Sequence, residues 1–376
     1  MGCLLAIFAS LLVAAVSPLA AQAARAFASR FSVNTEGNIA FVANQVTTCP
    51  TGCTTANSST ITWYDVDGTP ASAIQGGGTV ATFNSSTADL TLPPLSTVLF
   101  AGLYWGGNTA SGSQLGGAGT QAAPTLADRN KVYFKTPWMT GYTLVTATTV
   151  DDDFSQQATN PIYHSFFNAT ALVNSTPPTG TGTYGVANVQ TGLGSSGLGD
   201  FGGWTMIVVY RDPNGTLRNM SVFDGFDRVT GTASVDIPFG PFTTPATGVI
   251  NTNIGIVAMD GDPGIVGDAA TLNSGATCSA TATALSDATN PATNLFNSSI
   301  STLGANVATR NPADANTWGY DADIISANNV LTNGSTNACL RLKTNGDSYW
   351  PGAVTTATEL PSPNLNSVKT VVEGVR

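Results

Sequence analysis

Charged residues are scarce in this 376-residue sequence. Asp, Glu, Lys and Arg together make up 10% of it, whereas about 25% is usual in globular proteins. Lysine occurs four times and glutamate three times, and the other twenty acidic residues are all aspartate. Lys and Glu favour helices, while Asp, Asn and Gly favour turns and Thr favours strands. The composition therefore argues against a typical cytosolic enzyme and predicts an all-β protein.

Basic residues are too few for a protein that binds nucleic acid. The chain has 13 Lys and Arg residues, a net charge of −10 and no basic cluster. Nucleic-acid binding depends on cations that neutralise phosphates. We therefore expect no nucleic-acid partner, and the same shortage disfavours anionic membrane surfaces.

Histidine occurs only once, as His164 in NPIYHSFF. A Ser or Cys triad would have to use this residue, and the sequence has no G-x-S-x-G motif. Its aromatic neighbours favour a packed, structural histidine. Paired aspartates could instead serve a glycoside hydrolase. Four groups of aspartates occur, namely Asp151–Asp153, Asp224 with Asp227, Asp260 with Asp262 and Asp268, and Asp321 with Asp323. No spacing distinguishes an acid from a base, so we expect the protein not to be an enzyme.

Apolar runs of transmembrane length are missing beyond the N-terminus. There, an apolar core from Leu4 to Val16 precedes Pro18 and the small-x-small site Ala21-Gln22-Ala23, which is typical of a signal peptide. We assign the signal to residues 1–23 and expect a secreted or cell-surface protein. No transmembrane segment is expected after its removal.

Cysteines are few, and four remain once Cys3 is removed with the signal. An even number in an exported chain predicts disulfides. Cys49 and Cys53 lie in CPTGC, where Pro and Gly can close a small loop, and Cys278 and Cys339 are the remaining pair. A zinc site is disfavoured, because the chain has a single histidine and no second closely spaced cysteine pair.

The sequence does contain many short apolar or alternating runs separated by Gly, Asn and Asp. They predict strands at 39–47, 60–66, 97–105, 131–135, 142–150, 204–210, 220–223, 233–237, 253–259, 338–343 and 353–358. The run TMIVVY (205–210) is typical of a strand buried on both faces. Segments 165–173 and 321–331 indicate short helices, and 106–125 indicates a flexible loop. The pattern predicts a β-sandwich or jelly roll with long Gly/Asn-rich loops over residues 24–366.

Two aspartate-rich loops offer oxygen ligands for calcium. MDGDPGIVGD (259–268) supplies Asp260, Asp262 and Asp268, and WYDVDGT (63–69) supplies Asp65 and Asp67 as a weaker candidate. The first loop does not fit an EF-hand, because Ile265 stands where that motif needs glycine. Asp and Gly are also preferred in turns between strands. Calcium binding and simple turns therefore both remain open.

Several blocks of the sequence together resemble a known family. They are STVLFAGLYWGGNT (96–109), NATALVNSTPPTGTGTYGVANVQT (168–191), GGWTMIVVYRDPNGTLRNMSVFDGFDRV (202–229), IGIVAMDGDPGIVGDAATLN (254–273), NLFNSSIS (294–301), NTWGYDADII (316–325) and NGDSYWPGAVTTATEL (345–360). In this order they resemble the N-terminal domain of large secreted bacterial surface proteins that carry tandem conserved Ig-like repeats. The resemblance implies a β-rich, adhesin-like module with no catalytic residues to transfer. The tail SVKTVVEGVR (367–376) looks like the opening strand of a first repeat.

These observations lead to an exported, non-enzymatic structural or adhesion module as the expected function, with glycans or other surface proteins as partners. The alternative is a calcium-dependent carbohydrate-binding module, or a carbohydrate-active enzyme that uses paired Asp carboxylates. Exposed tryptophans can stack on sugars in that case, and the candidates are Trp63, Trp138, Trp318 and Trp350. Trp105 and Trp204 lie within expected strands and should be core residues.

Overall fold

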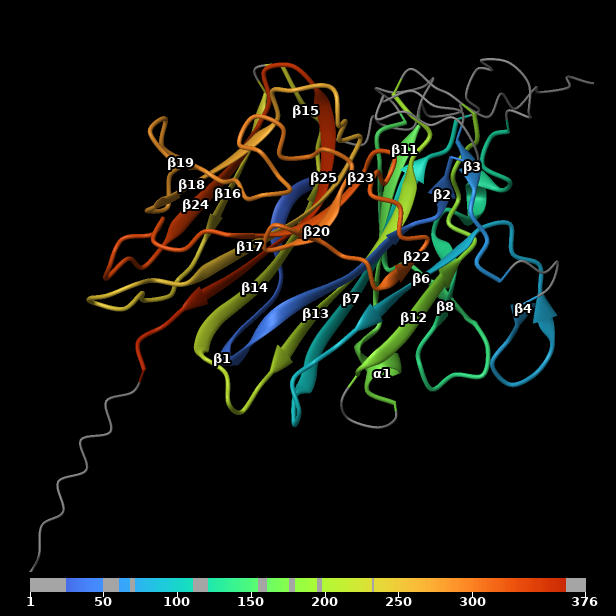
Figure 1. The fold of residues 1–376 in the computed structure, drawn as a ribbon, viewed down its shortest axis with the longest axis horizontal. Coiled ribbons are helices and arrows are strands. Elements are labelled where there is room, and N and C mark those ends of the chain that lie inside the picture. Colours follow the sequence, from blue (N-terminus) through green and yellow to red (C-terminus); the bar gives the residue numbers. More distant parts are fainter. Residues whose placement is uncertain are drawn as a thin grey trace, which may run out of the picture.

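A computed structural model describes most of the chain. The described residues are 25–49, 61–67, 72–110, 121–154, 161–175, 180–194, 198–231 and 233–362. The predicted signal peptide, Cys53 and the tail 367–376 lie outside them. Strands make up 52% of the structure and helices 2%, which confirms the predicted all-β, sandwich-like fold (Figure 1). None of the described helices is long and apolar enough to cross a membrane.

The largest element is a sheet of twelve strands, here called the long sheet. Along it run β10 (Thr149–Asp152), β11 (Ile162–Asn168), β7 (Thr97–Asn108), β13 (Gly202–Arg211), β1 (Arg25–Gln45), β14 (Leu217–Phe226), β25 (Ser348–Glu359), β17 (Thr252–Met259), β23 (Tyr320–Ser326), β20 (Ile300–Thr302) and β21 (Ala305–Asn306), with β15 (Val229–Thr230) paired to β25. All the pairings are antiparallel except that between β20 and β23.

Strand β1 divides the long sheet into two halves. It is 21 residues long. Its residues 25–36 pair with β14, and its residues 37–45 pair with β13. The first half of the sheet, β10, β11, β7 and β13, therefore lies on one side of β1, and the second half, β14, β25, β17 and β23, lies on the other.

Two smaller sheets cover the long sheet. The five-stranded sheet runs β22 (Arg310–Asn311), β6 (Ser85–Leu90), β12 (Gly182–Ala187), β8 (Lys131–Lys135) and β9 (Thr143–Thr146), and the four-stranded sheet runs β16 (Ser234–Phe239), β24 (Ala338–Lys343), β18 (Ala269–Ser274) and β19 (Thr283–Ala284). The short pairs are β2 (Thr47–Thr48) with β3 (Thr62–Trp63) and β4 (Ser72–Ala73) with β5 (Thr79–Val80). One helical turn, α1 (Thr170–Val173), and one 3₁₀ turn, Leu126–Asp128, complete the described elements. In Figure 1 the two smaller sheets lie at opposite sides of the molecule.

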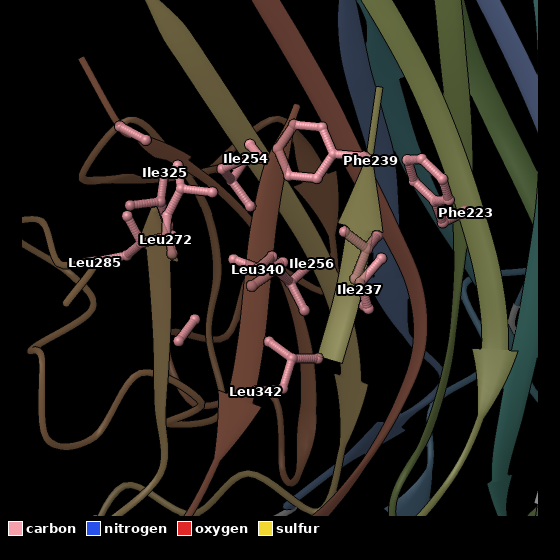
Figure 2. Close-up of a cluster of buried hydrophobic side chains, with 14 of the residues drawn as sticks. Phe223, Ile237, Phe239, Ile254, Ile256, Leu272, Leu285, Ile325, Leu340 and Leu342 are labelled. Carbon is pink, nitrogen blue, oxygen red and sulfur yellow. The ribbon is translucent and has the colours of Figure 1, made fainter. Parts of the chain in front are cut away.

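Three hydrophobic cores hold these layers together. The first lies between the four-stranded sheet and the second half of the long sheet, where Leu340 packs near Ile256 (Figure 2). The second lies between the five-stranded sheet and the first half, and contains Phe134 and Trp105. The third combines side chains from both halves of the long sheet, such as Ile207. The long sheet therefore folds so that one face of each half packs against the other.

Strands of the long sheet are buried on both faces because they contribute to two cores. In β13, Met206 and Val208 face the second core, whereas Ile207 and Val209 face the third. This confirms the prediction made from TMIVVY. Full burial of a large aliphatic side chain contributes about 2 kcal/mol, so an apolar residue at nearly every position of such a strand is favoured.

Several predicted elements were wrong. Segment 321–331 is not helical, because residues 320–326 form β23, which pairs with β17 on one side and β20 on the other. Residues 165–173 form the end of β11 followed only by α1. The predicted strand 142–150 is two strands, β9 and β10. The loop predicted at 106–125 starts too early, because Gly106 and Gly107 are buried in β7.

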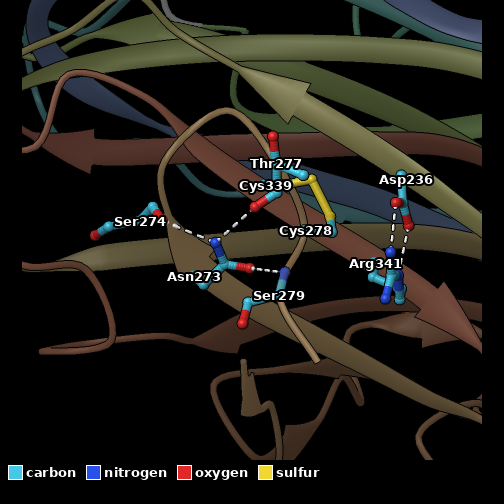
Figure 3. The surroundings of a disulfide bond; sticks show 8 residues. All are labelled: Asp236, Asn273, Ser274, Thr277, Cys278, Ser279, Cys339 and Arg341. Atoms are coloured by element: carbon cyan, nitrogen blue, oxygen red, sulfur yellow. Dashed lines mark hydrogen bonds and ion pairs between the residues drawn. A yellow bond between two sulfur atoms is a disulfide. The ribbon is translucent and has the colours of Figure 1, made fainter. Parts of the chain in front are cut away.

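The disulfide between Cys278 and Cys339 is confirmed. It joins β24 to the loop that follows β18, with 5.0 Å between the Cα atoms (Figure 3). Asn273 holds this loop in place, since its amide donates to the carbonyl oxygen of Thr277 at 3.0 Å and accepts from the Ser279 N–H at 2.9 Å. The predicted bond between Cys49 and Cys53 involves a residue outside the described part.

Candidate functional site

The aspartate-rich segment 260–268 is a connection between sheets. It leaves β17 of the long sheet and enters β18 of the four-stranded sheet, and these two strands do not pair with each other. A tight turn between paired strands is therefore not its role. Asp260 follows β17 directly and has a positive φ of 69°, a conformation that non-glycine residues rarely adopt.

Six aspartates around this connection lie close enough for their carboxylates to repel one another, and we call them the aspartate cluster. They are Asp260, Asp262 and Asp268 of the connection, Asp321 and Asp323 of β23, and Asp347 just before β25. Asp268 and Asp321 are fully buried, and Asp323, Asp260 and Asp347 are 1%, 3% and 8% exposed. Asp262 is half-buried and lies nearest to solvent. The fold thus brings the three sequence-predicted ligands together with three further carboxylates.

The segment 294–301 wraps around the buried part of this cluster. The Phe296 N–H donates to Oδ2 of Asp268 at 2.6 Å, and the Ser299 N–H donates to Oδ1 of Asp321 at 3.0 Å. The Ser301 hydroxyl donates to Oδ1 of Asp323 at 2.6 Å. One oxygen of each carboxylate therefore organises this segment.

The second oxygen of each of these carboxylates has no hydrogen-bond partner. The buried oxygens without a donor include Oδ1 of Asp268, Oδ2 of Asp321, Asp323 and Asp347, and the amide Oδ1 of Asn294. Buried polar atoms normally have partners, and each exception needs a physical explanation. All the atoms of this set are oxygens, which is the ligand type that Ca²⁺ prefers.

Burial and mutual repulsion raise the pKa values of the cluster. The pKa is raised to about 7 for Asp262 and Asp268, to about 8 for Asp323 and to about 6 for Asp347, in each case mainly by burial. The neighbouring carboxylates add to the increase, as Asp347 does for Asp262. Burial also raises the pKa of Asp260 and Asp321 well above the usual range.

Positive charge is sparse at this site. Among the described residues, no member of the cluster forms an ion pair. Arg228 lowers the pKa of Asp260, but it does so against the larger effect of burial. The cluster is therefore an accumulation of negative charge that needs protons or a bound cation for compensation.

The second predicted loop is organised differently. Oδ1 of Asp65 accepts from the Ser85 hydroxyl at 2.5 Å and from the Asp67 N–H at 3.2 Å. Oδ2 of Asp67 accepts from the Ser72 hydroxyl at 3.0 Å. Protein donors occupy these carboxylates, which favours a structural turn at this loop.

A third set of potential ligands does not form a metal site. Within the described residues, the only close set of at least three His, Cys, Asp or Glu ligand atoms is that of Asp236, Cys278 and Cys339, all within 4.8 Å of one another. The two sulfurs are bonded to each other, so neither is a thiolate ligand. Asp236 forms a two-fold ion pair with Arg341 at 2.6 Å (Figure 3).

Asp151 and Asp224 also meet, but they are joined through arginine. Arg25 binds Asp151 at 2.8 Å and Asp224 at 2.9 Å, and Arg30 binds Asp224 at 2.6 Å. The Tyr104 hydroxyl donates to Asp224 at 3.2 Å. This network links β1 to β10 and to β14 and gives both carboxylates a structural role.

His164 is a core residue, as its sequence context predicts. It is 2% exposed, and its ring stacks against the rings of Tyr104 and Phe226, with centroid distances of 5.4 and 6.0 Å. Burial lowers the pKa of the imidazole to about 4. It is therefore neutral at physiological pH.

The tryptophans that are buried are not only the two that the sequence predicted to be core residues. Trp350 is fully buried, because it lies in β25 between two layers, so the prediction that it is exposed was wrong. Trp105 and Trp204 are buried, as expected. Trp63 and Trp138 are partly buried, and their indole N–H groups donate to the carbonyl oxygen of Thr191 and to the hydroxyl of Ser175. Trp318 is also partly buried.

Comparison with known proteins adds no assignment. No protein-family model matches the chain, and no curated protein matches it significantly. The geometry of the described residues therefore carries the functional argument.

Proposed function

We propose that the chain is a non-enzymatic structural or adhesion module of a secreted or cell-surface protein. The observation that carries this proposal is the state of the potential catalytic groups. The single histidine is enclosed by aromatic rings, and Asp151 and Asp224 are neutralised by Arg25 and Arg30. These contacts give the groups a structural role, which supports the proposal.

The layered architecture supports the same proposal. A surface module must keep its shape without a cytosolic quality-control system, and three cores plus a disulfide provide rigidity. Disulfides persist in oxidising, extracellular compartments. The low content of lysine and glutamate and the N-terminal signal-like sequence agree with export.

The location is tested by labelling intact cells of the source organism with an antibody against the folded domain. We expect labelling without permeabilisation, or recovery of the protein from the medium. Detection only after permeabilisation would overturn the proposal.

The alternative functions are tested with the purified domain on a glycan array and on a panel of polysaccharides. Binding without turnover would assign an adhesion role toward glycans. Bond cleavage that an Asp→Asn substitution abolishes would instead show a hydrolase, and our proposal would then be wrong.

A further inference from the structure

We propose that the outer part of the aspartate cluster binds one Ca²⁺ ion, with Asp262, Asp268 and Asp347 as carboxylate ligands and the Asn294 amide oxygen as a neutral ligand. The inference does not depend on the cellular location of the protein. It rests on the placement of oxygen atoms and on the charge of the site.

These residues converge from three parts of the chain, and the three carboxylates lie close enough to interact electrostatically. Asp262 and Asp268 lie in the connection between β17 and β18, Asn294 lies in the wrapping segment, and Asp347 precedes β25. The Asn294 amide N–H donates to the carbonyl oxygen of Pro263 at 3.2 Å, which holds this side chain against the connection. The site therefore draws on segments that connect the long sheet and the four-stranded sheet.

Three buried oxygens at this site have no hydrogen-bond donor. Asp268 is fully buried, yet its Oδ1 has no partner, and the same is true of Oδ2 of Asp347 and Oδ1 of Asn294. A buried acceptor without a donor is costly, by about 1–3 kcal/mol per group. A cation that contacts these oxygens directly removes the cost at all three positions.

In Asp268 and in Asp347, one carboxylate oxygen accepts a hydrogen bond and the other does not. Oδ2 of Asp268 accepts from the Phe296 N–H, and Oδ1 of Asp347 accepts from the Ser348 N–H at 2.7 Å. These bonds fix the orientation of both carboxylates and leave the opposite oxygen available. Metal-binding carboxylates are commonly held in this way by hydrogen bonds.

Calcium suits this site better than magnesium or zinc. The ligands are carboxylate and amide oxygens, with no imidazole or thiolate. Within the described residues, the three carboxylates do not all lie within 4.8 Å of one another, so binding must draw them together. Ca²⁺ accepts six to eight oxygens in irregular geometry, whereas Mg²⁺ demands a nearly ideal octahedron. Asp262, on the half-buried part of the connection, is the ligand with most freedom to move.

Solvent reaches the site from the tip of the connection. Ile265 and Val266 are 39% and 62% exposed, and Asp262 precedes them in the same loop. The deeper carboxylates, Asp321 and Asp323, are closed off by the wrapping segment. We therefore place the ion at the outer carboxylates.

The test is calcium titration of the metal-free domain at pH 7.5, followed by calorimetry and by thermal unfolding. Extracellular modules bind Ca²⁺ with dissociation constants of about 10⁻⁴ to 10⁻³ M, so concentrations up to about 10 mM are needed. We expect one Ca²⁺ per chain and a Tm several degrees higher than in EDTA, with a much smaller effect of Mg²⁺. No bound calcium and an unchanged Tm would overturn the proposal.

Matched variants locate the ion. Asp262→Asn replaces the half-buried ligand and should leave the fold intact while it weakens calcium binding at least about tenfold, in line with loss of one charged ligand. Asp67→Asn in the second aspartate-rich loop should bind calcium as the unaltered protein does. If Asp67→Asn abolishes binding and Asp262→Asn does not, the ion belongs to the other loop and the proposal is wrong.

Discussion

At the scale of single residues, this protein compensates buried charge in two ways. Asp224 is 1% exposed and is surrounded by Arg25, Arg30 and the Tyr104 hydroxyl. Asp268 is equally buried, but it has backbone donors and no ion pair among the described residues. The first arrangement is complete within the protein, whereas the second is open to a proton or a metal ion.

Removal of the charge of Asp224 should be strongly destabilising. Asp224→Asn keeps the shape of the side chain but leaves two arginines without their shared carboxylate, and loss of one partner from a buried ion pair typically costs about 3–5 kcal/mol. Because both arginines are partly exposed, we expect a smaller loss than for a fully buried pair, about 2–3 kcal/mol. Urea unfolding measures this change. Asp89→Asn, at an exposed position in β6, is the control and should unfold as the unaltered protein does.

The cluster also predicts how stability depends on pH when calcium is removed. The folded pKa values of Asp262 and Asp268 are about 7, above the value of 3.8 for a free carboxyl, so the folded state holds more protons than the unfolded state between these limits. Stability is then fully present below about pH 4 and is lost as the pH rises through about 7.

Thermal unfolding in EDTA should therefore give a lower Tm at pH 8 than at pH 5. The Asp262→Asn variant is the comparison, and its Tm should fall less over the same range. A Tm that rises steadily from pH 5 to pH 8 would contradict the raised pKa values.

At the scale of elements, the sequence predicted those strands whose own residues carry a clear pattern of apolar and polar side chains. Lys131–Lys135 and Ala338–Lys343 have the predicted bounds, because their side chains alternate between a core and a more polar face. The beginning of β1, in contrast, is only partly buried and pairs irregularly with β14, with register shifts between Arg25 and Ala28 and between Ser29 and Phe31. The local pattern of β23 predicts a helix, because its partners, β17 and β20, lie elsewhere in the sequence and cannot be recognised from it.

The candidate site was predicted only in part, because some of its residues are distant from one another in the sequence. Asp260, Asp262 and Asp268 lie within nine residues, so their sequence proximity was visible. Asp347 lies in an ordinary NGDS turn, and nothing in its local sequence indicates that β25 brings it beside Asp262. The wrapping segment 294–301 could not be recognised as a site element either, because it contributes backbone N–H groups, serine hydroxyls and a single amide, which are common in any loop.

The disulfide should contribute substantially to the stability of the four-stranded sheet. It closes a loop over a sequence separation of 61 residues, and chain entropy for a loop of this size corresponds to about 4 kcal/mol. Replacement of both Cys278 and Cys339 by serine should lower the free energy of unfolding by about that amount, as measured with urea. A loss below about 1 kcal/mol would show that the register of β18 and β24 suffices to hold the loop.

At the scale of the whole molecule, the cores are connected through shared strands. β17 contributes Ile256 to the first core and Val257 to the third, and β13 contributes to the second and the third. Loss of one core therefore exposes a face of a strand that another core requires. The layers form one connected structure, and the long sheet is its centre.

The order of strands around β14 has a mechanical consequence. β1 and β25 flank β14 and both run antiparallel to it. Arg25, where β1 begins, lies opposite Phe226 at one end of β14, whereas Leu360, just after β25, bonds to Leu217 at the other end. Tension between Arg25 and Leu360 would therefore act along the strands and load many backbone hydrogen bonds at once, in shear. A domain pulled in this direction resists extension far better than one whose strands separate bond by bond.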